Sequence, residues 1–248
     1  MKSIVVIPAR YGSARFPGKP LANICGHPML WWVYERCKKI RRIDSVIVAT
    51  DDARIQNMCK DNDIPVVMTS PEHKNAACRL HEVSLLYPAD FYVQANGDEP
   101  LIDTAAVEAC IPESVPQDYE FGTNIITEMS EPSQVIDVAN IKVVFDVDMN
   151  ALYMSRTPIP TPFSSLDFKY YKHVGIIGYN KKMLDFYAAS KPGKFEAIEG
   201  IDTLRFIDYG KRLKFIIVRD CESLSVDTPK DLEVIRRLLK PHLGSESK

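Results

Sequence analysis

The chain has 248 residues, which is enough for one large α/β domain or for a domain with a subdomain. Its formal net charge of −2 gives no overall attraction to nucleic acid or to an anionic membrane, so any affinity for anions has to be local. No apolar run approaches the roughly 20 residues that span a bilayer, the N-terminus lacks a signal-peptide pattern, and the six cysteines form no C-x-x-C pair. We therefore expect a cytoplasmic protein with reduced thiols, without membrane insertion, a nucleic-acid partner, or a disulfide or zinc framework.

The first half of the chain alternates between short apolar runs and segments with helical periodicity. The apolar runs predict four strands, at residues 4–7, 46–49, 66–68 and 91–94. A first helix is predicted to open at His27-Pro28, because proline is tolerated at the first helical position, and two more are predicted at residues 53–62 and 78–86. Four apolar side chains of the first helix recur at helical spacing and are expected to face the sheet: Met29, Val33, Cys37 and Ile40. This βα pattern predicts an α/β fold, with a mostly parallel Rossmann-like sheet and helices on both faces.

The second half of the chain is less regular. Strands are predicted at residues 121–129, 141–146, 151–156, 173–179 and 215–218. Helices are predicted at residues 196–209 and 229–239. We find no internal repeat and no flexible linker, so residues 1–248 are expected to form one domain, in which residues from about 147 to 200 make a small subdomain.

The loop that follows the first strand, residues 8–19, combines small residues with cations. Its glycines, its serine and its cations are Gly12, Gly18, Ser13, Arg10, Arg15 and Lys19. A loop that leaves the carboxyl end of such a strand faces the usual ligand crevice of an open α/β sheet. Small residues let backbone N–H groups approach an anion, and the cations neutralise it. The loop therefore predicts a polyphosphate site, although not a P-loop, because no Gly-Lys-Ser/Thr follows at the right place; the alternative is a solvated basic loop.

Two aspartates follow strands at what should be the same edge of the sheet. Asp98 lies in Asn96-Gly97-Asp98-Glu99-Pro100, directly after the fourth strand, and Asp227 lies in Ser225-Val226-Asp227-Thr228-Pro229. Divalent cations favour such hard oxygen ligands, so the pair predicts one shared metal site. The alternative for Asp98 is a turn that caps the next helix, and for Asp227 an ordinary helix N-terminus with proline in the first turn.

Further polar side chains come after the third strand and near a later one. His73, Lys74 and Arg79 follow the third strand, again at the expected crevice. His173 begins an apolar strand, where a lone histidine is more often structural than catalytic.

Taken in order, these motifs resemble the 3-deoxy-manno-octulosonate (Kdo) cytidylyltransferases, also called CMP-Kdo synthetases. The resemblance covers nearly the whole chain. It is carried by Ile7-Pro8-Ala9-Arg10-Tyr11, Pro17-Gly18-Lys19-Pro20-Leu21, Val48-Ala49-Thr50-Asp51, Gly97-Asp98-Glu99-Pro100, Asn140-Ile141-Lys142-Val143-Val144, Ala151-Leu152-Tyr153-Met154-Ser155-Arg156, Lys172-His173-Val174-Gly175-Ile176 and Val226-Asp227-Thr228-Pro229.

The resemblance implies a nucleotidyltransferase in which the anomeric hydroxyl of an acidic 3-deoxy sugar attacks the α-phosphate of CTP, with pyrophosphate as the leaving group. By analogy the nucleotide is held by Pro8, Arg10, Gly12, Ser13, Arg15, Lys19, His73, Arg79 and Asn96. Lys19, Asp98 and Asp227 are the implied catalytic residues, with Mg²⁺ on the two aspartates, and the sugar acid is implied to contact Arg156, His173, Ile177, Asp202 and Thr203. A homodimer formed through residues around 150–200 and a role in lipopolysaccharide biosynthesis are implied in the same way.

The chain departs from the family where the family contacts the nucleotide and the sugar. The family's His-x-Ser-Gly-Thr-Glu/Asp-Arg reads His73-Lys74-Asn75-Ala76-Ala77-Cys78-Arg79, which keeps both ends and loses the hydroxyls. A glutamine becomes Asn96, a tyrosine becomes Ile177, and Glu-Gln becomes Asp202-Thr203. A site built to hydrogen-bond hydroxyls discriminates sharply against ligands that do not match it. We therefore expect an acceptor that differs from plain Kdo, for instance by an amine or an extra group, and that is still an acid because Arg156 and His173 are kept.

Two other hypotheses remain open from the sequence. One is CMP transfer to a different acidic acceptor, such as a phosphonate. The other is a diverged member that binds nucleotide without turnover, which the retained Lys19, Asp98 and Asp227 disfavour.

Overall fold

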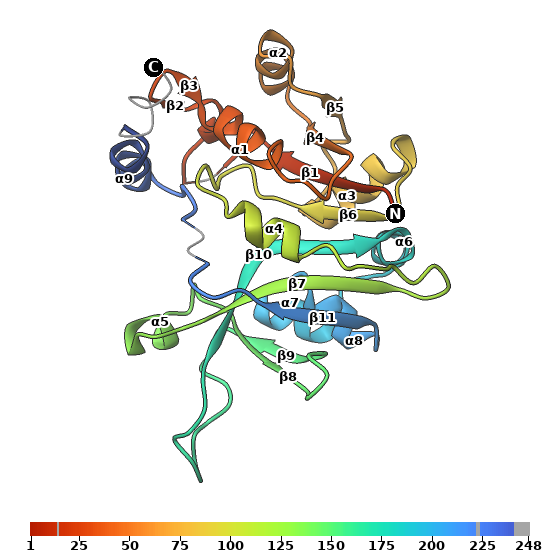
Figure 1. Cartoon of the computed structure of the whole chain (residues 1–248), viewed down its shortest axis with the longest axis vertical. Helices are drawn as coiled ribbons and strands as arrows, with labels where there is room; N and C mark the ends of the chain where they lie inside the picture. Colours follow the sequence, from red (N-terminus) through yellow and green to blue (C-terminus); the bar gives the residue numbers. More distant parts are fainter. Residues whose placement is uncertain (14, 222–223, 241–248) are drawn as a thin grey trace.

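The computed structural model describes residues 1–13, 15–221 and 224–240, and within them one mixed β-sheet forms the centre of the molecule (Figure 1). The main path of this nine-stranded sheet runs β11-β7-β10-β6-β1-β4-β5, and β8 and β9 extend it from β10. The strands are β1 (Ser3–Ala9), β4 (Ser45–Thr50), β5 (Val66–Met68), β6 (Phe91–Gln94), β7 (Phe121–Glu128), β8 (Lys142–Phe145), β9 (Ala151–Ser155), β10 (Tyr171–Asn180) and β11 (Arg212–Ile217). A separate small hairpin pairs β2 (Asn23–Ile24) with β3 (His27–Pro28).

Strand direction confirms the predicted parallel core and adds antiparallel pairing at β10, β8 and β9. β1 pairs in parallel with β4 and β6, β4 with β5, and β11 with β7. β10 runs antiparallel to both β6 and β7, so it joins the two parallel blocks. Because β10 lies inside the main sheet, part of the 147–200 segment belongs to the central sheet; the predicted subdomain boundary stays a prediction.

Helices cover both faces of the sheet, as the continuous apolar character of β1 predicts. Successive side chains of a strand point to opposite faces. Val5 and Ile7 pack on one side, while Ile4 and Val6 pack on the other. The helices are α1 (Met29–Cys37), α2 (Ala53–Asp61), α3 (Ala76–Leu86), α4 (Thr104–Ala109), α5 (Pro132–Ile136), α6 (Lys181–Ala189), α7 (Lys194–Glu199), α8 (Leu204–Asp208) and α9 (Pro229–Leu239), with a 3₁₀ turn η1 (Lys19–Leu21).

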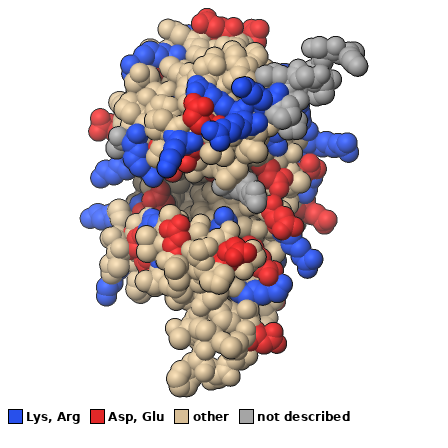
Figure 2. Space-filling model, turned by 90° about the vertical axis from the view of Figure 1, so that its left-hand side faces the viewer, with Lys and Arg blue, Asp and Glu red and all other residues tan. Residues whose placement is uncertain are grey.

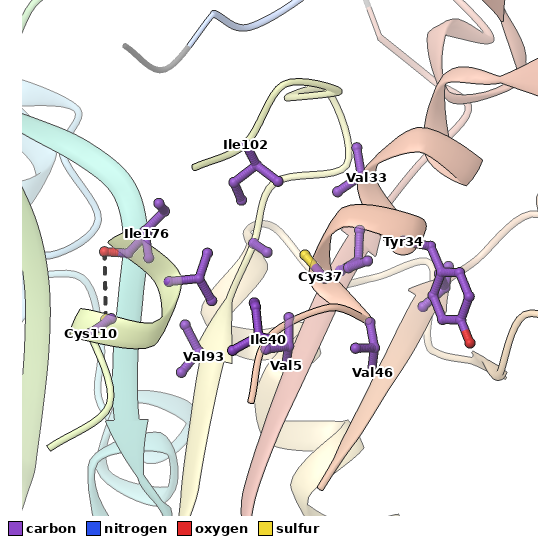
Figure 3. Close-up of a cluster of buried hydrophobic side chains, with 14 of the residues drawn as sticks. Val5, Val33, Tyr34, Cys37, Ile40, Val46, Val93, Ile102, Cys110 and Ile176 are labelled. Carbon is purple, nitrogen blue, oxygen red and sulfur yellow. Dashed lines mark hydrogen bonds between the residues drawn. The ribbon is translucent and has the colours of Figure 1, made fainter. Parts of the chain in front are cut away.

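Each face has its own apolar core. α1, α2 and α4 pack with Val5, Val46 and Val93 in one cluster, where Val33 and Cys37 of α1 reach the strands (Figure 3). α3, α6 and α8 form the cluster of the opposite face. These two layers bury almost all of β1.

Three helix predictions need correction. Residues 196–209 form two helices, α7 and α8, because Gly200 adopts φ 63°, a left-handed conformation that ends α7. His27-Pro28 pairs as β3, and Pro28 is the extended N-cap of α1 rather than its first residue. Met29 packs with α9 in a third apolar cluster and not against the sheet.

The six cysteines are all free, which agrees with the prediction that the chain has no disulfide framework. No helix among the described residues is long and apolar enough to cross a membrane. Between β9 and β10, residues 156–170 project from the body at the bottom of Figure 1. Phe163 and Leu166 on this projection are 95% and 84% exposed.

Candidate active site

A cavity of about 520 Å³ opens at the carboxyl ends of β1 and β6. These strand ends lie on the left of Figure 1, the side that faces the viewer in Figure 2, where the surface is hollowed and Lys and Arg side chains gather above the hollow. The cavity is lined by Pro8, Ala9, Arg10, Ser13, Arg15, Lys19, Pro20, His73, Lys74, Asn75, Ala76, Arg79, Asn96, Gly97, Asp98, Asp202 and Asp227. The structure thus brings together nearly all the predicted nucleotide and metal residues. Gly12, which belongs to the same loop, is exposed and does not line the cavity.

Tyr11 organises the loop after β1. Its carbonyl oxygen accepts hydrogen bonds from the backbone N–H groups of Ser13 and Gly18, at 3.0 and 2.8 Å. The Arg54 guanidinium lies 3.3 Å from the centroid of the Tyr11 ring, and Asp52 holds that guanidinium through Nε and NH2. The sequence predicted no structural role for Tyr11 or Arg54, because these roles depend on a contact between the loop and the start of α2.

Gly18 is required by the shape of this loop, so a side chain there should disturb the cavity. Gly18 has φ +73°, and an added β-carbon would come within 2.9 Å of the Tyr11 ring. A left-handed conformation costs an alanine about 1–2 kcal/mol. If the loop binds the nucleotide, Gly18→Ala should raise KM for CTP by roughly 5- to 30-fold. Gly210→Ala is the matched control, since Gly210 has φ +66°, open space around it and no place in the cavity lining; a similar KM change in both variants would contradict this role.

The predicted convergence of Asp98 and Asp227 is present, and Lys19 lies between them. Lys19 Nζ donates to Asp98 Oδ2 at 2.6 Å and to Asp227 Oδ1 at 3.1 Å. Arg15 NH2 contacts the same Asp227 oxygen at 2.9 Å. Two carboxylates that are 129 positions apart in the sequence thus both contact the Lys19 ammonium, in the loop that follows β1.

Backbone contacts place these two carboxylates. The N–H of Val226 donates to the carbonyl oxygen of Asp98 at 2.8 Å, which joins the segment before α9 to the segment after β6. Thr228 caps α9 in a reciprocal pair with Asp231, so Asp227 immediately precedes a fixed helix start. Gly97 allows the chain to pass the end of β1, because a β-carbon there would lie 3.0 Å from the carbonyl oxygen of Pro8.

These residues suit a divalent cation in donor chemistry and number. Mg²⁺ prefers hard oxygen ligands and is usually held by one or two carboxylates, with substrate phosphates and water in the other positions. Asp98 and Asp227 supply two such carboxylates at one point. Among the described residues there is no group of three or more His, Cys, Asp or Glu that forms an all-protein metal cage. A magnesium ion bound here would therefore take water or substrate phosphate oxygens in its remaining positions.

The opposite wall of the cavity is held by paired polar groups. Arg79 is 4% exposed, and it donates to Asp51 Oδ2 at 2.7 Å and to the hydroxyl of Thr69. His73 Nε2 lies 2.5 Å from Glu82 Oε2. These two ends of the altered family motif are therefore anchored by partners within the chain.

Asn75, which lies between those ends, and Asn96, which follows β6, also have partners. Asn75 caps α3 through the N–H of Cys78, and its amide donates to the Tyr187 hydroxyl at 2.7 Å. Asn96 accepts from Gln94 at 3.0 Å and donates to Glu99 at 2.9 Å. Asn75 was not singled out from the sequence; its position directly before α3 is the signal that could have shown it.

Of the five residues assigned to the sugar acid by resemblance, Asp202 lines the cavity and the other four do not. Arg156 donates to three carbonyl oxygens, those of Val138, Glu199 and Gly200, at 3.0, 2.8 and 3.2 Å. The assignment of these four residues to the sugar acid therefore stays a prediction.

The remaining three lie in or beside the sheet core. Ile177 is 5% exposed in the core shared with α3 and α6, and the Thr203 hydroxyl lies 3.2 Å from Met154 Sδ. The Nε2 atom of His173 is buried with no described partner, and burial lowers the pKa of this imidazole to about 4. His173 is thus neutral at physiological pH.

An open α/β sheet with a cation-rich loop after its first strand, and two converging carboxylates at the same edge, defines a nucleotidyltransferase site. The cytidylyltransferase family profile matches residues 4–213, and the chain belongs to this family.

The chain is 39% identical over 237 residues to a protein of Shewanella frigidimarina named 8-amino-3,8-dideoxy-manno-octulosonate cytidylyltransferase, covering 94% of this chain and 96% of that one. A protein of the same name from Shewanella oneidensis is 37% identical over 237 residues, with the same coverage. Among solved structures, a CMP:2-keto-3-deoxy-manno-octonic acid synthetase complexed with CTP superposes with a TM-score of 0.90, at 33% identity over 98% of this chain and 100% of that one. The inositol-1-phosphate CTP transferase of T. maritima, with a TM-score of 0.64 and 12% identity, shares the fold.

Proposed function

We propose that this enzyme transfers CMP from CTP to an acidic 3-deoxy-octulosonate whose C8 hydroxyl is replaced by an amine. The observation that carries the proposal is a full-length similarity, to relatives named for that acid, in a chain whose cavity holds Lys19, Asp98 and Asp227 together. The sequence departures at Asn96 and Asp202, both of which line the cavity, support an acceptor other than plain Kdo.

The chemistry follows from charge and position. The anomeric hydroxyl of the acid forms a bond from its oxygen to the α-phosphorus and releases its proton to water. The bond from that phosphorus to the bridging oxygen breaks, and pyrophosphate leaves with the electron pair. Enzymes that catalyse phosphoryl transfer act mostly by positioning the reactants and stabilising charge. Arg10, Arg15 and Lys19 would neutralise the triphosphate from the loop after β1. Asp98 and Asp227 would hold Mg²⁺, which supplies further charge neutralisation at the phosphates.

The test is a comparison of kcat/KM values for 8-amino-3,8-dideoxy-manno-octulosonate and for Kdo, measured by pyrophosphate release with CTP and Mg²⁺. We expect the 8-amino sugar acid to be the better substrate, by roughly 10-fold or more, because a mismatched polar group in a binding site costs on the order of 1–3 kcal/mol. If Kdo were the best acceptor of a wide panel, the amino-sugar assignment would be wrong. A phosphonate in the same panel tests the hypothesis that CMP is transferred to a different acidic acceptor. CTP binding without turnover of any acid would favour the hypothesis of a family member that binds nucleotide without catalysis.

We further propose that the enzyme works in the cytoplasm as a homodimer and that the projection between β9 and β10 contributes to the interface. Large exposed apolar groups on a projecting segment are typical of interaction surfaces. Phe163 and Leu166 are such groups, at 95% and 84% exposed.

The dimer proposal predicts a change in assembly when the projection is made polar. Replacing Phe163 and Leu166 together by aspartate should raise the dimer dissociation constant by about 100-fold or more, because each buried apolar side chain contributes about 1.5–3 kcal/mol. Light scattering during size-exclusion chromatography measures the mass. The paired control replaces Leu85 and Leu86, which are 59% and 55% exposed on α3, by aspartate. A wild-type mass of one chain, or a projection variant that stays dimeric, would rule out this interface.

A further inference from the structure

One acidic side chain of the cavity has no hydrogen-bond or ion-pair partner among the described residues. Three aspartates line the cavity: Asp98 and Asp227, which contact Lys19 and Arg15, and Asp202. The Asp202 carboxylate makes no hydrogen bond or ion pair with any described residue, and it is accessible from the open cavity. It comes from the connection between α7 and α8, whereas Asp98 and Asp227 follow β6 and precede α9. The cavity therefore holds one carboxylate that no described residue pairs, in addition to the cations of the loop after β1 and Lys74 before α3.

The cation that influences Asp202 is already committed elsewhere. Arg205 donates through Nε and NH2 to both oxygens of Glu196, at 2.7 and 2.6 Å, and through NH1 to the carbonyl oxygens of Tyr187 and Ser190. The same guanidinium stacks on the Tyr187 ring at 3.9 Å. Arg205 is thus paired with Glu196 in a buried ion pair, and its charge only partly offsets that of Asp202.

The surroundings of Asp202 penalise that charge. Nearby protein atoms desolvate the carboxylate although it faces the cavity, and this desolvation, followed by the negative charge of Glu196, raises its pKa. Asn75 and Ala76 at the start of α3 line the same cavity, and Asn75 donates to Tyr187, which stacks under Arg205. A partly desolvated, unpaired carboxylate is stabilised most by a cationic ligand that can donate hydrogen bonds to it.

We propose that Asp202 binds the ammonium group of the acceptor and so determines the preference for an amino sugar acid over its hydroxyl analogue. This inference rests on the proposed function, because it assigns one part of the acceptor to one residue. Arg10, Arg15 and Lys19 lie with the triphosphate end of the cavity, where a second ammonium would be repelled. A zwitterionic acceptor matches a cavity that holds both these cations and a carboxylate with no partner among the described residues.

The experiment is the ratio of kcat/KM for the 8-amino acid to kcat/KM for Kdo, in the wild type, Asp202→Asn and Asp202→Glu. Asn is nearly isosteric and removes the charge, so this ratio should fall by roughly 10- to 100-fold, as expected for the loss of a charge-assisted hydrogen bond. KM for CTP should change little. Glu keeps the charge and should retain most of the preference. Asp118→Asn, which removes an exposed carboxylate outside the cavity, should leave the ratio unchanged.

A second measurement needs no variant and remains decisive if Asp202→Asn does not fold. The wild type is given the acid with its amine N-ethylated, which keeps the ammonium charge, or N-formylated, which removes the charge with the same number of added heavy atoms. We expect the ethyl compound to be used at least about 10-fold more efficiently.

The outcomes separate this inference from the proposed function. If the wild type uses neither sugar acid, the proposed function is wrong. If the wild type prefers the 8-amino acid and Asp202→Asn keeps that preference, or if the formyl compound is used as well as the ethyl one, the role of Asp202 is overturned while the proposed function stands.

Discussion

Replacing Lys19 by methionine should lower kcat/KM for CTP by about 10²- to 10³-fold, the usual loss when one preorganised charge-stabilising donor is removed from an active site. Lys19 Nζ lies 2.6 Å from Asp98 and 3.1 Å from Asp227, and it also donates to the carbonyl oxygen of Val226 at 3.0 Å. Its loss removes a cation that faces the phosphates, and it leaves two converging carboxylates that repel each other and the triphosphate. Steady-state kinetics with CTP, at a saturating concentration of the acid, measure the effect.

Methionine keeps the apolar part of the Lys19 side chain, so the charge is the main change. Lys39→Met serves as the control, because Lys39 is an exposed cation just beyond α1 and does not line the cavity. Thermal unfolding of both variants separates a loss of charge stabilisation from a loss of fold. Unchanged CTP kinetics in a folded Lys19→Met enzyme would remove Lys19 from the nucleotide site.

Metal removal should abolish turnover, and the two carboxylates should determine how much metal is needed. With EDTA we expect no measurable pyrophosphate release, and added Mg²⁺ should restore it. Asp98→Asn and Asp227→Asn should each lower kcat by at least about 100-fold at fixed Mg²⁺, because each loses a charged oxygen ligand at the phosphates. Each should also shift the Mg²⁺ concentration for half-maximal activity upward.

The control for the metal prediction is Asp61→Asn, an exposed carboxylate at the end of α2. Full activity in EDTA would exclude a divalent cation from the reaction. A normal Mg²⁺ requirement in both aspartate variants would place the metal elsewhere.

Much of the fold could be predicted because its signals are local. The run at residues 4–7 is apolar on both faces of the strand, and the structure covers both faces with helices. The helix at residues 229–239 was predicted with its observed bounds, because Thr228 caps it and Pro229 suits its first turn. The break between α7 and α8 was missed because Gly200 in the left-handed region overrides an apolar periodicity that continues through it.

The direction of β10 could not be predicted from its sequence. Its apolar pattern suits a buried strand of either direction, and its antiparallel pairing with β6 and β7 depends on contacts with residues 43 to 89 positions away. The α4 and α6 helices were not predicted either. Each begins after a capping side chain, Asp103 or Asn180, which is the local signal that could have shown it.

The cavity contains most of the residues predicted for the nucleotide and the metal, but only one of those predicted for the acceptor. Lys19, Asp98 and Asp227 stand next to strand ends or helix starts, so the topology alone brings them together. The residues predicted for the acceptor lie in the connection between α7 and α8, directly after β9 and in β10, whose packing the sequence does not specify. Ile177 and Thr203 were expected to reshape the pocket, but they lie in the core, and Asp202 is the altered residue of that set that faces the cavity.

Transfer of the α-phosphate of CTP to the acid is the most direct test of the proposed reaction. CTP labelled at the α-phosphorus is incubated with the enzyme, Mg²⁺ and 8-amino-3,8-dideoxy-manno-octulosonate. The products are then separated and identified by mass spectrometry. We predict that the label moves into a CMP conjugate of the acid, with one pyrophosphate released per conjugate, and that neither product forms without the acid. Label that stays in CTP with every acid tested, or pyrophosphate released at the same rate without an acid, would contradict the proposed function.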